Sequence, residues 1–466
     1  MSADYAEFLA SKDRTFVGVG LPTDPDDLPG ELFDFQRAIT AWACGKGRAA
    51  IWADTGLGKT VMEAAWLDRM VGPDEQGLIL APLAVAHQTV REAHRLLDLD
   101  ITYVRNAAEA VGKRLVICNY DRLDDLDPAA FVAVVLDESS ILKSFSGTTK
   151  RALVERFKRT PYRLSASATP APNDLEELCN HADFLGVMAP QEMRSTFFIA
   201  DNRGQFMKYR IKGHAEGAFY GWLASWAMAC RTPSDLGFPD DGYLLPGLNI
   251  RAHYVESEYR PEGELFLARL NGITERATVR KATMAERCEL AARLVDAEPD
   301  ESWLVWCGLN DESATLARLV EDAVEVTGSD PAQAKADALL DFADGSIRVL
   351  VTKPAIAGMG MNFQTCARMV FVGLNDSYEQ YYQAIRRCYR FGQERGVEVH
   401  IVLSDAEESI YANVLAKESV ARETARGLIA AVSERNRAEL FKGTSKADSF
   451  VPTLALRLPA FLCGVA

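Results

Sequence analysis

A short apolar run that ends in a glycine-rich loop constrains this sequence more than any other feature. The run covers residues 51–53, and the loop Asp54-Thr55-Gly56-Leu57-Gly58-Lys59-Thr60 follows it. This order predicts a buried strand, a loop and then a helix. Glycines let such a loop turn its amides toward a polyanion, and the helix N-terminus adds partial positive charge. The pattern therefore predicts an α/β protein with a phosphate-binding loop.

The side chains of this loop suit ATP with Mg²⁺. Lys59 would neutralise charge on the β- and γ-phosphates, and Thr60 would ligate Mg²⁺. The other candidate cofactor-binding residues are Ala53, Thr55, Gly56, Leu57 and Gly58, and Ala53 stands where the usual pattern has glycine. The alternative is a glycine-rich β–α turn that binds nothing.

A glutamine upstream of the loop is a candidate contact for the adenine ring. Gln36 follows aromatic residues at the start of a predicted helix, just ahead of the strand. A glutamine amide can both donate to and accept from an adenine edge. A polar residue at a helix start is the plainer explanation, so Gln36 stays a hypothesis.

A second apolar run ends on two acids. Phe131–Leu136 is continuous and rich in valine, as a parallel strand covered on both faces requires, and Asp137 and Glu138 follow it. After such a strand one carboxylate can hold Mg²⁺ while its neighbour orients the attacking water. We predict these catalytic roles for Asp137, as a Mg²⁺ ligand, and for Glu138. The alternative is an acidic strand end or a helix cap.

The strand–helix alternation occurs twice along the 466 residues, which is enough chain for two to three domains. Short apolar strands are predicted at 77–81, 115–120 and 131–136, and again at 303–307, 349–352 and 369–372. A helix is predicted at 314–323. We therefore predict an α/β fold of two lobes with parallel sheets. Their limits are 1–190 and 255–432, with a helical, aromatic insertion and linker at 191–254 and a tail at 433–466.

The insertion is rich in aromatic residues that have bases nearby. Aromatics beside bases suit contact with nucleic acid. Trp222 and Trp226, however, stand four apart in an apolar run, which favours packing in a helix core.

The second lobe carries a run of arginines between Gln383 and Gln393. Arg387 and Arg390 are three apart, so they share one face of a helix. Two guanidiniums in this arrangement can meet a γ-phosphate bound on the other lobe. A basic helix end is the alternative interpretation.

The net charge of −15 opposes a nucleic-acid partner, because phosphate binding depends on Lys and Arg. The local balance differs: residues 139–163 hold seven bases and one acid, a balance of +6. We predict that Lys143, Lys150 and Arg151 in this stretch contact backbone phosphates. The alternative is a solvated basic helix face.

Other functional classes fit poorly. No uninterrupted run approaches about 20 apolar residues, so no membrane span is expected. The first 22 residues lack the apolar core of a signal peptide. Nine cysteines are scattered without a Cys-x-x-Cys pair, which argues against zinc sites and a disulfide framework. A cytoplasmic location is expected, and protein partners are unknown.

Taken in order, these blocks resemble a superfamily 2 helicase of the DEAD/DEAH-like type, specifically the Swi/Snf-type branch in a compact, phage- or bacterial-like form. The resemblance covers about residues 32–410. It identifies Gln36 as the adenine-reading glutamine, residues 53–60 as motif I and 137–140 as motif II. Residues 383–393 are similar to motif VI, which begins at Gln383 and whose arginines fall on Arg387 and Arg390.

The resemblance implies two RecA-like lobes with ATP and Mg²⁺ in the cleft between them. It also implies a helicase or translocase that couples ATP hydrolysis to movement on nucleic acid, expected to be DNA. Two alternatives stay open. One is a translocase that remodels complexes on double-stranded DNA without unwinding it, and the other is a regulatory module that ATP switches without motor activity.

The chain departs from the branch at three places. Ser139 and Ser140 stand where relatives usually carry Ala-His, Arg386 stands where an acid is common, and Pro354 lies inside the region similar to motif V. Residue roles in motif V are therefore not transferred.

Overall fold

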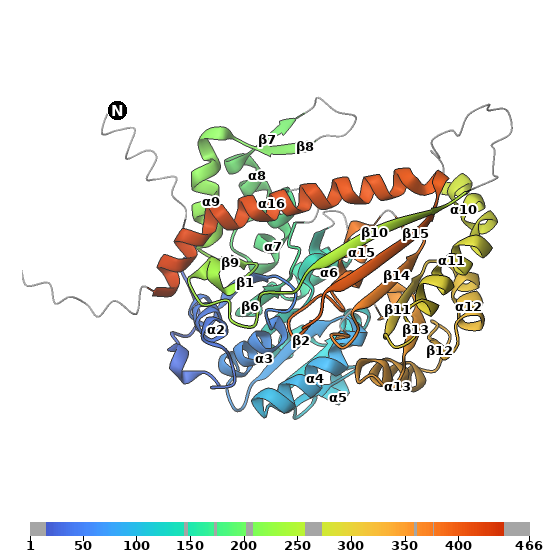
Figure 1. The fold of residues 1–466 in the computed structure, drawn as a ribbon. Coiled ribbons are helices and arrows are strands. Elements are labelled where there is room, and N and C mark those ends of the chain that lie inside the picture. The colour runs from blue at the N-terminus through green and yellow to red at the C-terminus, as the bar shows by residue number, and fades with distance from the viewer. Residues whose placement is uncertain are drawn as a thin grey trace, which may run out of the picture.

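Two parallel sheets organise the computed structural model (Figure 1). It describes residues 15–143, 148–171, 175–201, 208–256, 273–357, 361–375 and 377–441. Among these residues a seven-stranded sheet has the order β3-β4-β2-β5-β6-β1-β9, and a six-stranded sheet has the order β10-β15-β14-β11-β13-β12. We call the first sheet with its helices lobe 1 and the second lobe 2. The predicted α/β class with two parallel sheets is confirmed.

The strands of lobe 1 are β1 (Arg48–Ala53), β2 (Gln76–Ala81), β3 (Ile101–Tyr103), β4 (Leu115–Asn119), β5 (Phe131–Leu136), β6 (Tyr162–Ala166) and β9 (Ala227–Cys230). Those of lobe 2 are β10 (Leu248–Val255), β11 (Trp303–Cys307), β12 (Ala323–Glu325), β13 (Val349–Thr352), β14 (Arg368–Val372) and β15 (Val397–Ser404). A separate antiparallel hairpin consists of β7 (Phe198–Asp201) and β8 (Lys208–Ile211).

Before β10 the helices are α2 (Asp34–Lys46), α3 (Lys59–Met70), α4 (Leu83–Leu97), α5 (Ala107–Ala110), α6 (Thr148–Arg156), α7 (Leu178–Leu185), α8 (Pro190–Phe197) and α9 (Glu216–Ala224). After β10 they are α10 (Ile273–Ala282), α11 (Met284–Asp296), α12 (Asn310–Leu319), α13 (Ala332–Ala343), α14 (Pro354–Ala357), α15 (Tyr378–Ile385) and α16 (Glu408–Phe441). No described helix is both long enough and apolar enough to cross a membrane.

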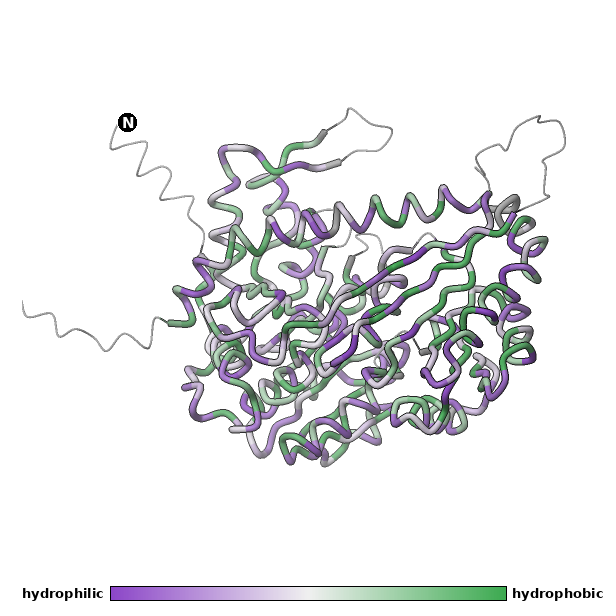
Figure 2. The backbone as a smooth tube through the Cα atoms, in the orientation of Figure 1, coloured by the Kyte–Doolittle hydropathy of each residue, from purple (hydrophilic) through white to green (hydrophobic). Residues whose placement is uncertain are grey.

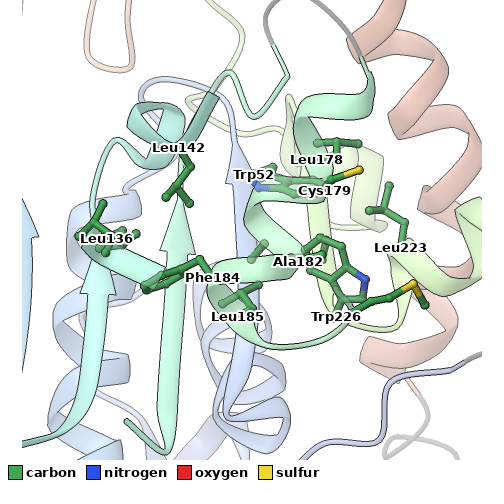
Figure 3. Close-up of a cluster of buried hydrophobic side chains, with 14 of the residues drawn as sticks. Trp52, Leu136, Leu142, Leu178, Cys179, Ala182, Phe184, Leu185, Leu223 and Trp226 are labelled. Carbon is green, nitrogen blue, oxygen red and sulfur yellow. The ribbon is translucent and has the colours of Figure 1, made fainter. Parts of the chain in front are cut away.

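Both faces of the lobe 1 sheet are buried, because successive side chains of a strand point to opposite faces. In β1, Trp52 enters one hydrophobic cluster while Ile51 and Ala53 enter the other. Figure 3 shows the first cluster, in which Trp52 packs against Trp226 with ring centroids 5.5 Å apart. This double burial explains why the strands read as continuous apolar runs, which Figure 2 shows as green stretches of the backbone.

The region predicted as a helical insertion and linker contains strands of both sheets. β9 pairs with β1 at the edge of the lobe 1 sheet, and β10 pairs with β15 at the edge of the lobe 2 sheet. Trp222 and Trp226 are buried, which confirms their interpretation as core residues. The helix predicted at 314–323 lies at 310–319, because the Glu312 carboxylate caps its first turn.

The last described helix returns from lobe 2 to lobe 1 (Figure 1). Near its start, Ile410 and Val414 belong to a lobe 2 core. Farther along, Leu428 and Val432 belong to a lobe 1 core, and Glu439 forms an ion pair with Lys46 of α2 at 3.1 Å. Helix α16 therefore connects both lobes, although the sequence prediction assigned residues 255–432 to lobe 2 and 433–466 to a tail.

Candidate active site

The loop between β1 and α3 has the backbone of a phosphate-binding loop. Gly56 and Gly58 adopt φ angles of +93° and +77°, which residues with a Cβ atom rarely adopt. Gly58 has a second reason to be glycine, because a Cβ atom there would lie 2.3 Å from the Gln36 Nε2 atom. Helix α3 begins at Lys59, so its N-terminus faces this loop.

The polar groups of the loop are available to an anion. No described residue accepts a hydrogen bond from the backbone amides of Gly56, Gly58 or Thr60. The Lys59 ammonium donates to the carbonyls of Ala53 at 3.0 Å and Asp54 at 3.3 Å. These are neutral acceptors that a phosphate would replace, so the loop fits the phosphates of a nucleotide.

Gln36 lies directly behind the loop. Its side-chain oxygen accepts from the Phe33 amide, and its Nε2 atom donates to the Leu57 carbonyl at 3.0 Å. Leu57 is buried, while Thr55 donates its amide to the Asp54 carboxylate. The structure thus places Gln36 beside the loop, with its amide oxygen and one amide hydrogen used by protein groups.

The two acids of motif II follow β5, and the Lys59 charge acts on Asp137. Asp137 is buried, its carbonyl accepts from the Tyr120 hydroxyl at 2.6 Å, and its carboxylate accepts from the Glu138 amide at 2.8 Å. Burial, together with the Glu138 charge, raises the pKa of Asp137 to about 7. Glu138 has a φ of +50°, a strained value for a residue with a side chain.

Glu63 is a third carboxyl of the site, and the sequence prediction missed it. It lies four residues after Lys59 on α3 and is fully buried, and neither carboxyl oxygen has a hydrogen-bond partner among the described residues. Burial, then the charge of Asp137, raises its pKa well above the usual value. The signal was its spacing from Lys59, since residues four apart share one helix face.

These carboxyls fit Mg²⁺ held together with a nucleotide. No three His, Cys, Asp or Glu side chains of the described residues converge on a metal-sized site. Mg²⁺ at phosphates is usually held through one or two carboxylates, the phosphates and water. Asp137 and Thr60 have the chemistry for that role.

Arg387 brings a positive charge from lobe 2 to these acids. It is buried, and its guanidinium donates to the carbonyls of Gln383 at 3.2 Å and Met361 at 3.3 Å. Burial lowers the pKa of Arg387, whereas the charges of Glu138 and Asp137 oppose that change. Gln383 takes part through its backbone carbonyl.

Arg390 points to a different part of the interface. Its guanidinium donates to the Asn362 side chain, whose amide donates to Glu92 of α4 at 3.3 Å. Burial, then the Arg387 charge, lowers the pKa of Arg390 to about 10. Of the two predicted arginines, only Arg387 therefore faces the acids of motif II in this structure.

The predicted nucleic-acid residues do not form one surface. Lys150 is buried and pairs with Asp183 at 2.7 Å, which contradicts a phosphate contact. Arg163 of the same basic stretch is also buried and donates to the Phe184 carbonyl at 2.5 Å. Arg151 is exposed, and the Lys143 side chain lies outside the described residues. The corrected track loses Lys150 and keeps Arg151, while the prediction for Lys143 stays a prediction.

A cavity of about 310 Å³ lies between the lobes beside the phosphate-binding loop. Asp54 lines it from lobe 1, Tyr382 and Arg386 from lobe 2, and Arg422 and Leu428 from α16. This cavity places further polar groups at the interface, and one of them, Asp54, belongs to the phosphate-binding loop.

Comparison with known proteins matches residues 286–392 to the helicase conserved C-terminal domain. "Putative protein p41" of Acyrthosiphon pisum secondary endosymbiont phage 1 is 24% identical over 439 residues, which cover 81% of this chain and 94% of the phage protein. "DNA annealing helicase and endonuclease ZRANB3" of Bos taurus is 22% identical over 437 residues, 82% of this chain and 39% of that protein.

"DNA excision repair protein ERCC-6" of Homo sapiens is 27% identical over 198 residues, which cover 34% of this chain and 13% of that protein. The chain therefore spans well under half of ZRANB3 and a small part of ERCC-6. The family match lies in lobe 2, and the two longer matches cover most of the chain.

Proposed function

We propose that this chain, a superfamily 2 helicase of the Swi/Snf-type branch with two RecA-like lobes, hydrolyses ATP between its lobes and couples hydrolysis to movement on DNA. The observation that carries the proposal is the position of Arg387, a buried lobe 2 guanidinium near enough to Asp137 and Glu138 of lobe 1 for their charges to act on its pKa. The Lys59 charge also acts on Asp137. A hydrolytic site needs anion binding, a group that orients water and positive charge for the transition state. These residues have the chemistry for all three.

Each residue has a role in this proposal. The amides of Gly56 and Gly58 and the Lys59 ammonium would hold the β- and γ-phosphates. Thr60 and Asp137 would hold Mg²⁺, which supplies charge neutralisation when bound. Glu138 would orient the attacking water and accept its proton. Arg387 would stabilise charge that develops on the γ-phosphate. Arg390, three residues later in the chain, lies in the same interface.

DNA is the proposed nucleic acid because the names of the two named animal relatives refer to DNA annealing and DNA excision repair. On the protein itself, Arg151 supports a phosphate contact that is independent of base sequence. A cytoplasmic location stays a prediction. The lobe limits proposed here follow the sheets, with β9 in lobe 1 and β10 in lobe 2.

The test is a titration of the ATPase rate with duplex DNA, single-stranded DNA and RNA. We expect little hydrolysis alone and strong stimulation by DNA. ATP binding without stimulated hydrolysis would contradict the motor and favour the ATP-switched module. If duplex DNA stimulates, displacement of a triplex strand without separation of a duplex would identify a translocase that does not unwind.

A further inference from the structure

An ion pair joins the phosphate-binding loop to the arginine-bearing segment of lobe 2. The Arg386 Nη2 atom lies 2.8 Å from the Asp54 Oδ2 atom. We propose that Arg386 is a positioning residue for ATP hydrolysis, which sets the place of Arg387 by docking on Asp54. This inference rests on the proposed function, because it assigns a role within that same site.

Asp54 is a fixed docking point. Its Oδ1 atom accepts from the Thr55 amide at 2.7 Å and from the Tyr382 hydroxyl at 2.6 Å, so Oδ2 is left for Arg386. Its own amide donates to the Cys230 carbonyl at 3.0 Å, which ties it to β9. The Asp54 carboxylate is therefore held in a fixed position relative to the lobe 1 sheet.

Arg386 is held in place by contacts within lobe 2. Its guanidinium lies over the rings of Tyr382 at 5.2 Å and Tyr389 at 5.5 Å, and its Nε atom donates to the Tyr382 hydroxyl at 3.2 Å. Burial alone would lower the pKa of Arg386, but Tyr382 and Asp54 outweigh it and raise that pKa. The guanidinium is therefore charged and oriented.

The pair is shielded from water. The Arg386 and Asp54 side chains are only 15% and 18% exposed. Screening by water and salt weakens exposed pairs, whereas a pair in this environment keeps more of its interaction. Arg386 stands where the family commonly has an acid, so this attraction depends on a departure of the present chain.

Docking at this point controls the residues that follow. Arg387 is the next residue, and the amide nitrogen of Phe391 would lie only 3.0 Å from a Cβ atom on Gly56. The segment after α15 therefore lies directly on the phosphate-binding loop. A misplacement of about 1 Å at such a site can reduce the rate by about 10²-fold.

Loss of the pair would not separate the lobes. Helix α16 still connects them, since its end is fixed to lobe 1 by the Lys46–Glu439 ion pair. Asn362 also still reaches Glu92. We therefore expect a change in how the lobes align, which affects turnover more than nucleotide affinity.

The kinetic test uses Arg386→Ala, Asp54→Asn and the double variant, measured at saturating DNA. Each single change is expected to lower kcat by about 10²-fold with KM for ATP nearly unchanged. The double variant should be no slower than the slower single variant, because both changes remove one interaction. Arg386→Lys should restore part of kcat, since it keeps the charge but not the planar fork.

The matched control is Arg395→Ala. Arg395 pairs with Glu301 at 2.8 Å within lobe 2, so its loss removes an ion pair of the same length away from the interface. Wild-type kcat is expected for this variant. Fully additive losses for Asp54→Asn and Arg386→Ala, or a KM effect as large as the kcat effect, would overturn the positioning role.

A second readout needs no hydrolysis. Spin labels at Arg95 on α4 and Ala314 on α12, both exposed, report the distance between the lobes without nucleotide. Arg386→Ala should broaden that distribution, and Arg386→Lys should narrow it again. An unchanged distribution in Arg386→Ala would overturn the proposal. If the wild type fails to hydrolyse ATP in the presence of DNA, the proposed function is wrong. The distance between the spin labels still tests whether the Arg386–Asp54 pair aligns the lobes.

Discussion

The loop after β1 in lobe 1 and the loop after β11 in lobe 2 both join an interior strand to a helix, but the amides at the start of the two loops differ in whether a protein carboxylate accepts from them. In lobe 1, no described residue accepts from the amides of Gly56 and Gly58. In lobe 2, the amides of Gly308 and Leu309 both donate to the Glu312 carboxylate, each at 2.9 Å.

Lobe 2 thus supplies its own anion where lobe 1 leaves room for phosphate. Glu312 is fully buried and pairs with the equally buried Arg287 at 2.8 Å, while Glu407 lies 3.9 Å from the same guanidinium. The comparison teaches that parallel-sheet topology provides the place for an anion at a helix N-terminus. Side-chain charges decide whether that anion is a ligand or part of the protein.

The largest effect is expected where lobe 1 meets its ligand. Glu138→Gln should lower turnover by up to about 10⁴-fold and keep ATP binding, because the amide cannot accept the proton of water. Lys59→Ala should weaken both binding and turnover. Titration with a fluorescent nucleotide, followed by steady-state kinetics, separates the two. Normal hydrolysis by either variant would contradict the assignment of that residue to an ATP site in lobe 1.

Removing the buried Glu312 carboxylate of lobe 2 should lower the stability of the protein and leave its affinity for nucleotide unchanged. Glu312→Ala leaves the Arg287 charge with poorer compensation, so we expect a loss of about 3–5 kcal/mol in the free energy of unfolding. Urea titration monitors the transition of lobe 2. A double replacement, Arg287→Met with Glu312→Gln, should recover part of the loss. A change in the free energy of unfolding below about 1 kcal/mol in Glu312→Ala would show that Glu312 does not compensate the Arg287 charge.

The buried acids of the lobe 1 site should also make stability depend on pH. Burial, together with Glu138, raises the pKa of Asp137 to about 7, compared with about 3.9 in an unfolded chain. Between these values the folded state holds a proton that the unfolded state has released. This group therefore makes stability fall with rising pH across that window, by up to about 1.4 kcal/mol per pH unit.

Glu63 acts in the same direction, because its pKa is also raised. Unfolding free energies between pH 5 and 8, measured for the wild type and Asp137→Asn, test the slope. The variant should show a flatter dependence. Identical slopes would mean that Asp137 is ionised throughout.

The smallest expected effect is on DNA binding, and it distinguishes the buried, paired Lys150 from the exposed Arg151. Arg151→Ala should lower the log–log salt slope of duplex DNA binding by about 0.9 and leave stability within about 0.5 kcal/mol. Lys150→Ala should leave that slope unchanged and reduce stability, since Asp183 loses its partner. The reverse pattern would restore Lys150 to the track and exclude Arg151.

Local patterns predicted the parts of the site that lie within one segment. Continuous apolar runs located β5 and β11, and the glycines with Lys59 located the loop between β1 and α3 that we propose binds phosphate. Contacts between distant segments were not predictable in this way. The pairing of Lys150 with Asp183, or of Asp54 with Arg386, depends on the packing of separate elements.

Sheet membership shows the same limit. β9 consists of four small or apolar residues inside an aromatic stretch, so its pattern does not distinguish a strand from a buried helix segment. Its pairing with β1 places it in lobe 1. Likewise, nothing local in α16 indicates that Leu428 and Val432 pack on the first lobe.

The most direct test of the central claim is the turnover of Arg387→Ala at saturating ATP and duplex DNA, with ATP affinity measured in parallel. A point variant is preferable to cutting the chain between the lobes, because a cut would also remove the part of α16 that packs on lobe 1. If Arg387 completes the site from lobe 2, turnover should fall by about 10³-fold or more while affinity stays near that of the wild type. Undiminished turnover would show that lobe 1 hydrolyses ATP without this arginine, and would contradict a site shared by both lobes.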